Sequence, residues 1–238
     1  MTELRWTTAG ESHGLALIGI LEGLPAGFEL DLARIDRELA RRRRGYGRSS
    51  RMQIEHDVAR CLAGLRGGRT LGSPLALQID NRDASIERLP VPTSPRPGHA
   101  DLAGCQKLTA RDPRAVLERA SARETAMRVA LGAAARQVLE AFGVEVFAHV
   151  VELGGVRVRE RAFEEAQGRR AELRESSEFA ALDPGVEAAW RSNVDAAKAA
   201  GDTLGGVFEV RALGLPPGLG GYADPAQRLT STGNTKLA

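Results

Sequence analysis

The strongest constraint on the fold is one long helical pattern that is apolar on two sides. Its main apolar stripe consists of Met127, Leu131, Ala134, Val138 and Ala141, and its opposite side carries Ala126, Ala130 and Ala133. Ser121 and Glu124 have the spacing of a capping box, and Gly143 is placed to end the helix. Both faces of this helix can therefore be buried, with neighbouring elements packed closely against it.

Shorter patterns surround this helix. A second helix is predicted to begin after Asp31, with Leu32, Ile35 and Leu39 at helical spacing. Residues 89–99 hold four prolines and predict a stiff, extended loop, whereas 157–200 are polar and helical in character and predict a peripheral excursion. Strands are predicted at residues 4–8, 17–21, 75–79, 144–151 and 205–212. Because strands and helices mix without strict alternation, the fold class is α+β.

The composition excludes several classes of protein. The chain has 238 residues, 42% hydrophobic and 27% charged, with a net charge of +2, which suits one large domain or two small ones. No apolar run approaches the roughly 18 residues of a membrane helix, and the first ten residues lack a secretory pattern. Cys61 and Cys105 are too few for a disulfide framework and have no thiol partner at metal-ligand spacing. We therefore expect a cytoplasmic protein with reduced thiols and no metal site.

Two histidines lie in settings that could carry chemistry. His13 is followed by glycine in the turn Gly10-Glu11-Ser12-His13-Gly14, so a ligand can reach an imidazole that titrates near neutrality. His99 lies in the loop 96–101, where Asp101 could accept a hydrogen bond from the imidazole and fix its tautomer. An ordinary turn histidine and an inert surface histidine are the alternative interpretations.

Two arginine-rich segments are candidate anion sites. Arg119 and Arg123 flank the start of the long helix, whose free N–H groups suit a phosphate, although two solvated arginines on a well-capped helix would look the same. Residues 41–44 are an unbroken run of four arginines, followed by Arg48 and Arg51. Guanidinium groups bind phosphates and carboxylates in forked pairs, so a multiply charged small molecule would suit this cluster. A solvated face and an RNA-binding Arg/Gly segment remain alternatives, although Tyr46 is the only aromatic residue in it.

Six segments, taken in order, resemble the signatures of the chorismate synthase family. They are residues 10–25, 41–52, 96–101, 121–129, 201–207 and 214–220. The resemblance implies a sheet–helix–sheet sandwich, a homotetramer and a lyase of the shikimate pathway to aromatic amino acids. That lyase converts 5-enolpyruvylshikimate 3-phosphate to chorismate and phosphate by a 1,4-anti elimination that requires reduced FMN. NADPH or an external flavin reductase would supply the reducing equivalents, and neither nucleic acid nor membrane is implied as a partner.

The resemblance also assigns roles to single residues. His13 would donate a proton or hydrogen bond to the departing phosphate, and His99 would stabilise the anionic reduced flavin. The segment that matches the family's flavin contacts is Arg119, Ala120 and Ser121. Arg42 and Arg48 match arginines that the family uses for anionic ligands, including NADP. The residues expected to line the substrate pocket are Glu11, Ser12 and Arg123.

The end of the sequence departs from the family pattern. Family members usually continue for well over a hundred residues beyond 214–220, whereas residues 231–238 do not resemble the family continuation. We therefore expect an incomplete family domain at 1–230 and a non-family tail at 231–238. The hypothesis that follows is a truncated chain, which is either a lyase or a catalytically impaired binding or assembly module.

Overall fold

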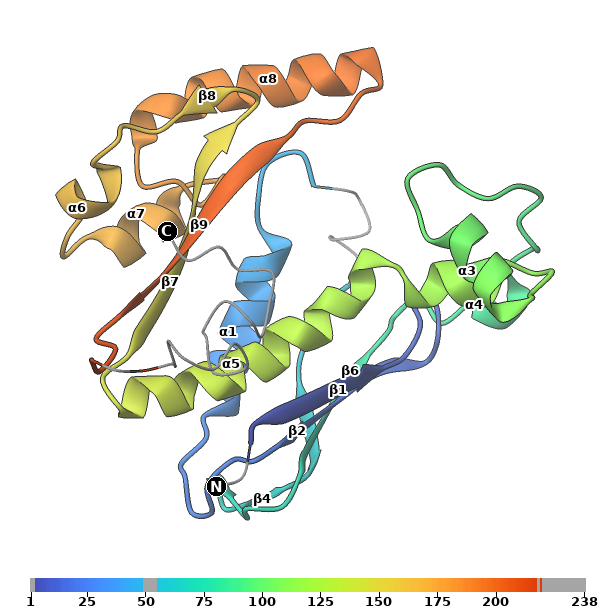
Figure 1. Ribbon diagram of the computed structural model, residues 1–238, viewed down its shortest axis with the longest axis horizontal. Coiled ribbons are helices and arrows are strands. Elements are labelled where there is room, and N and C mark those ends of the chain that lie inside the picture. Colours follow the sequence, from blue (N-terminus) through green and yellow to red (C-terminus); the bar gives the residue numbers. More distant parts are fainter. Residues whose placement is uncertain (1–2, 49–54, 218, 220–238) are drawn as a thin grey trace.

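The structure, a computed structural model, describes residues 3–48, 55–217 and 219. Two larger antiparallel sheets lie on either side of a long helix (Figure 1). The first sheet has the order β1-β2-β6-β3, and its strands are β1 (Arg5–Ala9), β2 (Ala16–Glu22), β6 (Leu75–Asp80) and β3 (Arg60–Ala63). The second has the order β8-β7-β9, and its strands are β8 (Val156–Arg157), β7 (Glu145–Leu153) and β9 (Gly206–Leu213). A short hairpin joins β4 (Leu65–Arg66) to β5 (Arg69–Thr70).

Helix α5 (Thr125–Ala141) is the central element of the fold. It packs against α1 (Leu32–Arg43) and the first sheet, and its far end also contacts β7. Met127 and Ala130 of α5 are fully buried, as are Leu17 on β2 and Leu77 on β6. A Cβ on Gly19 of β2 would lie 2.5 Å from the Met127 sulfur, so glycine permits this close approach. The predicted α+β class and the sheet–helix–sheet arrangement are therefore confirmed.

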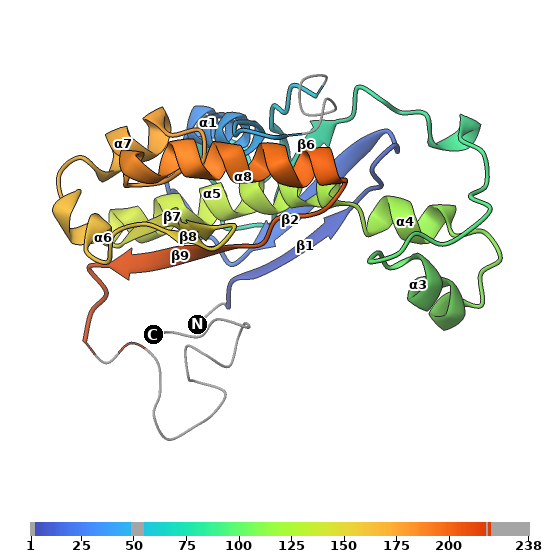
Figure 2. The same cartoon turned by 90° about the horizontal axis from the view of Figure 1, so that it is seen from above.

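The remaining helices lie toward the two ends of the molecule. Helices α6 (Ala162–Glu165), α7 (Arg170–Ser176) and α8 (Glu187–Ala200) accompany the second sheet, as the polar stretch 157–200 predicts. Trp190 of α8 is fully buried, and its indole N–H donates to the Val156 carbonyl at 2.9 Å. Helices α3 (Asp101–Leu108) and α4 (Arg114–Arg119) form a separate pair at the opposite end (Figures 1 and 2).

The structure corrects one feature of the helix start. Asp31 caps α1 as predicted, since its carboxylate accepts from the Ala33 N–H at 2.8 Å. Ser121, in contrast, caps a single 3₁₀ turn, Ala122–Glu124, and does not form a capping box with Glu124. The Glu124 carboxylate instead accepts hydrogen bonds from Thr8 and Arg128, so a tertiary contact replaces the local one.

Some expectations concern residues outside the described part of the chain. The proposed tail at 231–238 and Arg51 lie there, so they stay predictions. Within the described residues, no helix combines the length and the apolar character needed to cross a membrane.

Candidate active site

The loop between β1 and β2 is attached to the end of α4. The Ser12 N–H donates to the Glu118 carbonyl at 3.0 Å. Arg119 donates from Nη2 to the carbonyl and hydroxyl of Thr8, at 2.8 and 2.9 Å. Two motifs that are more than one hundred residues apart in the sequence therefore form one structure.

His13 is held by a buried carboxylate. Its Nδ1 lies 2.7 Å from Glu118 Oε2, and the same oxygen accepts the His13 backbone N–H at 3.1 Å. The Glu118 side chain is fully buried and also accepts from Arg114 at 3.0 Å. Burial alone would raise the pKa of Glu118, but the hydrogen bonds from His13 and Arg114 outweigh it and hold that pKa below its usual range. An ionised Glu118 thus orients the imidazole.

The other ring nitrogen of His13 faces a more open region. Its Nε2 lies 3.6 Å from Asp83 Oδ2, and about a quarter of the imidazole is exposed. A histidine that is fixed on one nitrogen and partly exposed suits proton donation to a ligand.

Asn81 connects the histidine loop to Arg123. Its amide Nδ2 donates to the carbonyls of Glu11 and Gly14 at 3.0 and 2.8 Å, and its Oδ1 accepts from Arg123 Nε at 2.8 Å. Asn81 is buried and comes directly after β6. One amide therefore sets the distance between the loop and the guanidinium group.

Arg123 is a buried cation inside an acidic pair. Its Nη1 donates to Asp57 Oδ1 at 2.5 Å, and its Nη2 lies 3.6 Å from Glu55 Oε2. Within the described residues, Arg123 Nη2 makes no hydrogen bond. The carboxylates offset the cost of burying the charge, and the remaining N–H capacity is available to an anionic oxygen.

Arg42 reaches the same cluster from α1. It donates from Nη2 to the Ala122 carbonyl and the Thr125 hydroxyl at 2.9 and 2.8 Å, and its Nη1 lies 3.8 Å from Asp57. Arg48, its expected partner, lies elsewhere, with its Nε on the Arg44 carbonyl at 3.2 Å. The structure therefore brings Arg42 and Arg123 to the same carboxylate, Asp57, and places Arg48 in the wall of a cavity near α7.

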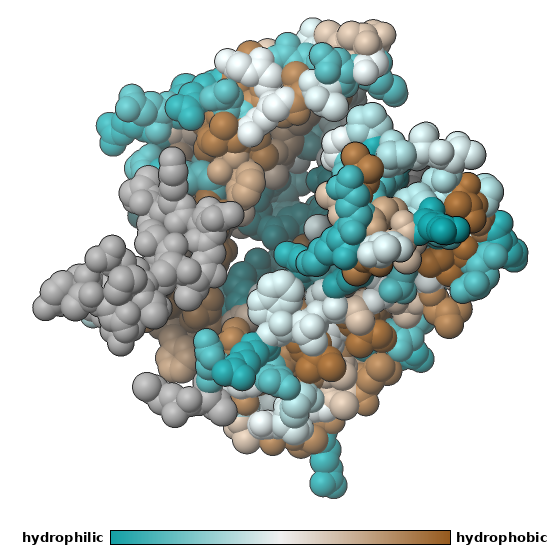
Figure 3. All heavy atoms as spheres, turned by 45° about the vertical axis from the view of Figure 1, so that its right-hand side comes forward, coloured by the Kyte–Doolittle hydropathy of each residue, from teal (hydrophilic) through white to brown (hydrophobic). Residues whose placement is uncertain are grey.

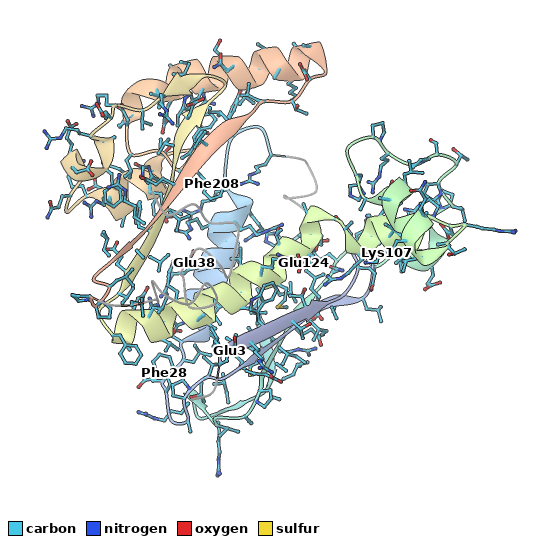
Figure 4. The ribbon with its side chains drawn as sticks, viewed as in Figure 1. Glu3, Phe28, Glu38, Lys107, Glu124 and Phe208 are labelled. Carbon is cyan, nitrogen blue, oxygen red and sulfur yellow. The ribbon has the colours of Figure 1, made fainter. Side chains whose placement is uncertain are left out.

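The expected flavin segment is the turn between α4 and α5. Ala120 donates its N–H back to Val116, and the Ser121 hydroxyl accepts from the Arg123 N–H at 3.3 Å. Figure 4 labels Glu124 at this turn and Lys107 on the neighbouring α3. The space-filling view shows a hollow on one face of the molecule with hydrophilic side chains around it (Figure 3).

His99 has a carboxylate partner of its own. Its Nδ1 lies 2.5 Å from Asp101 Oδ1, as the loop sequence predicts. Arg96 also binds Asp101, through Nε at 3.0 Å and its backbone N–H at 3.1 Å. The hydrogen bond from Arg96, with that from His99, holds the pKa of the buried Asp101 far below its usual range.

The two histidines are attached to the same pair of helices. Asp101 begins α3, and Glu118 lies near the end of α4. A Cβ on Gly104 of α3 would lie 2.3 Å from a methyl group of Val116, so the two helices are in close contact. The α3–α4 pair therefore carries the carboxylate partners of both imidazoles.

Sequence reasoning missed the acidic and amide residues of the site. These are Glu55, Asp57, Asn81, Asp83 and Glu118. Glu118 had a weak signal, since it follows two apolar residues in the segment that ends at Arg119. The others lie in stretches without a helical or strand pattern, and only the fold brings them to the arginines.

Comparison with known proteins decides the family. Residues 4–233 match the sequence profile of the family described as chorismate synthase. The chain belongs to the chorismate synthase family. It is 51% identical over 240 residues to the chorismate synthase of Desulforudis audaxviator (strain MP104C) and 50% identical over 236 residues to that of Symbiobacterium thermophilum. These alignments cover 95% and 92% of this chain.

A solved structure gives the same result. A crystal structure of chorismate synthase superimposes with a TM-score of 0.79 at 42% identity, covering 95% of this chain and 63% of that one. The chain spans about 60% of the length of the two curated relatives. The family resemblance of the six segments is therefore confirmed, and the residue roles within the site stay predictions.

Proposed function

We propose that this protein acts in the elimination that converts 5-enolpyruvylshikimate 3-phosphate to chorismate and phosphate. The observation that carries the proposal is His13, fixed by the buried carboxylate of Glu118 and connected through the Gly14 carbonyl and Asn81 to Arg123. Family membership supports a lyase of the shikimate pathway.

The geometry suits phosphate departure. Phosphate leaves more easily when its growing negative charge is neutralised by fixed donors in a water-poor site. Since Glu118 occupies Nδ1 of His13, the proton available to the departing oxygen is the one on Nε2. Arg123 Nη2, which has no hydrogen-bond partner among the described residues, adds a second cationic donor. The C–O bond breaks with its electrons going to phosphate, and the ring loses a proton on the opposite face.

The described residues also fit a reduced flavin. The residues that would hold it are Arg119, Ala120, Ser121 and His99. The Arg119 guanidinium group is partly exposed at the turn 119–121, and about a quarter of the His99 side chain is exposed. Asp101 fixes the orientation of the His99 imidazole, so that His99 can offer a hydrogen bond to an anionic ring system. Reduced FMN, when bound, would supply electron density to the substrate ring during phosphate loss and take up the ring proton afterwards.

The proposal includes the substrate pocket and the partners. Glu11 and Ser12 would line the pocket through the loop that Asn81 holds. Arg42 would serve an anionic ligand such as the phosphate of NADPH, and a separate flavin reductase is the other source of reduced FMN. A homotetramer is the proposed assembly.

Turnover under anaerobic conditions tests the proposal. The 238-residue chain is mixed with photoreduced FMN and the substrate, and the release of phosphate and chorismate is followed. Replacing His13 by alanine should lower the rate by about 10²- to 10⁴-fold. The control is His56→Ala, since His56 is exposed and contacts Arg43.

Two outcomes would count against this assignment. Equal rates for the two variants would remove His13 from the chemistry. Retained binding of reduced FMN without turnover would favour the binding or assembly module instead.

A further inference from the structure

A cavity whose lining includes neither His13 nor His99 lies where the loop after α1 meets the end of α7. Its volume is about 550 Å³. Four arginines and two glutamates contribute to its wall, namely Arg41, Arg44, Arg48, Arg174, Glu175 and Glu178. Arg41, Arg44 and Arg48 belong to the arginine cluster of the sequence, whereas Arg174 and the two glutamates come from a segment about 130 positions away, which only the fold brings close.

Positive charge exceeds negative charge in this wall. Glu175 is shared by three guanidinium groups, with Arg44 at 2.9 Å, Arg174 at 3.2 Å and Arg41 at 3.9 Å. Glu178 is already paired with Arg191, and Arg41 is also paired with Glu38 outside this wall. One carboxylate can accept only a few hydrogen bonds, so much of the donor capacity of these arginines is left for another anion.

Two further observations indicate crowding of cations. Within the described residues, the Arg174 Nε atom is buried and makes no hydrogen bond. Burial lowers the pKa of Arg41, Glu38 offsets this only in part, and the nearby Arg174 charge lowers the pKa further. Each effect would be relieved by an anion placed between these side chains.

The wall of the cavity is held in place. The Tyr46 N–H donates to the Glu178 carbonyl at 3.1 Å, and its hydroxyl donates to Asp195 at 2.7 Å. A Cβ on Gly47 would lie 2.8 Å from Val194, so the loop fits closely against α8. A preorganised wall reduces the conformational entropy that the protein would lose on binding a ligand.

We propose that this cavity binds a small organic anion with two or more negative charges and an apolar portion. The guanidinium groups would take the phosphate or carboxylate oxygens, and the carbon skeleton would lie against Val150, Leu153, Phe179 and Leu204. The site is separate from the proposed lyase site, because Arg42 turns toward Thr125 while Arg44 and Arg48 line this cavity.

Calorimetric titration with inorganic pyrophosphate at low ionic strength tests the proposal. Arg44→Gln should weaken binding about tenfold, the loss expected for one charge-assisted hydrogen bond. Glu175→Gln should strengthen binding, because it removes the internal competitor for three guanidinium groups. The controls are Arg37→Gln on α1 and Glu172→Gln on α7, which make the same charge changes at residues that do not line the cavity.

Chemical protection locates the bound anion. Pyrophosphate should slow the modification of Arg44 by phenylglyoxal and leave that of Arg37 unchanged. The proposal is overturned if Glu172→Gln and Glu175→Gln change the affinity equally, or if Arg44 is not protected. Because the test needs neither flavin nor turnover, its failure is distinguishable from failure of the proposed lyase function.

Discussion

At the scale of single residues, Glu118 is the carboxylate on which the histidine loop depends. Its carboxylate accepts hydrogen bonds from the His13 ring, from the His13 backbone N–H and from the Arg114 guanidinium group. Because the pKa of Glu118 is lowered in the fold, its stabilisation is present above its unfolded pKa of about 4.3 and is lost as pH falls through the folded pKa.

Glu118→Gln should therefore lower the free energy of unfolding at pH 7 by about 1 to 3 kcal/mol, since buried donors lose a charged acceptor. It should also flatten the loss of stability between about pH 5 and pH 3. Urea unfolding at a series of pH values measures both. The exposed Glu160→Gln is the control with the same charge change, and equal effects of the two substitutions would contradict the role given to Glu118.

His149 should give a pH dependence of the same sign at higher pH, because its pKa is also lowered in the fold. It is buried on β7 with its Nε2 3.0 Å from Glu209. Burial lowers its pKa, and Glu209 offsets this only in part. As pH falls below about 6.5, the unfolded chain takes up a proton that the folded chain resists, so stability decreases.

His149→Gln should reduce that decrease between about pH 7 and pH 5. Thermal or urea unfolding across this range is the measurement, and His56→Gln, at an exposed position, is the control. An unchanged pH slope in the His149 variant would show that another group is responsible.

At the scale of elements, the α3–α4 contact should tolerate almost no added volume. Gly104→Ala would place a methyl group 2.3 Å from Val116, so we expect a loss of about 1 to 3 kcal/mol from overpacking. The same change at Gly132 in α5, where nothing lies within 4 Å, should stabilise the protein by about 0.5 to 1 kcal/mol through helix propensity.

Urea unfolding of both variants, and of the double variant Gly104→Ala with Val116→Ala, measures these changes in the free energy of unfolding. The double variant should recover part of the stability lost in Gly104→Ala, because the added methyl group then has room. If Gly104→Ala is as stable as Gly132→Ala, the close packing of α3 on α4 is wrong.

The predictability of each element follows from how local its signals are. Helix α5 and strands β2 and β6 carry their periodicity within their own sequence, and all three form where it predicts, apart from the first turn of the helix. Helices α3 and α4 were missed because their N-cap residues, Ala100 and Pro113, have no side chain that can cap a helix. Helix α4 also has only six residues. Their position depends on packing between Gly104 and Val116, which no local pattern shows.

The candidate site divides in the same way. His13 and Arg123 could be found because each lies in a recognisable segment of the sequence. Their partners could not, since Glu118 is 105 residues from His13 and Asn81 is 42 residues from Arg123. The capping box at Ser121 failed for a related reason, because Glu124 binds Thr8, 116 residues away.

At the scale of the whole molecule, the buried apolar residues form separate clusters. The largest joins the first sheet to α1 and α5, whereas two smaller clusters lie between the second sheet and α6, α7 and α8. On β9, Phe208 is 71% exposed, so the second sheet buries less apolar surface than the first. The smaller clusters should therefore open at a lower free energy than the larger one.

Native-state hydrogen exchange tests this order of opening. The amides of β7 and β9 should exchange through a partial unfolding, while those of β2 and β6 should require global unfolding. Tyr46→Phe removes the hydrogen bond from the loop after α1 to Asp195 of α8, so it should speed exchange in α8 and leave β2 and β6 unchanged. The control compares Asp195→Ala with the double variant that also carries Tyr46→Phe. In the Asp195→Ala background, Tyr46→Phe should not change the exchange further, because the same hydrogen bond is already lost. Identical opening free energies in the two sheets would instead show that α5, through its contact with β7, couples them into one cooperative unit.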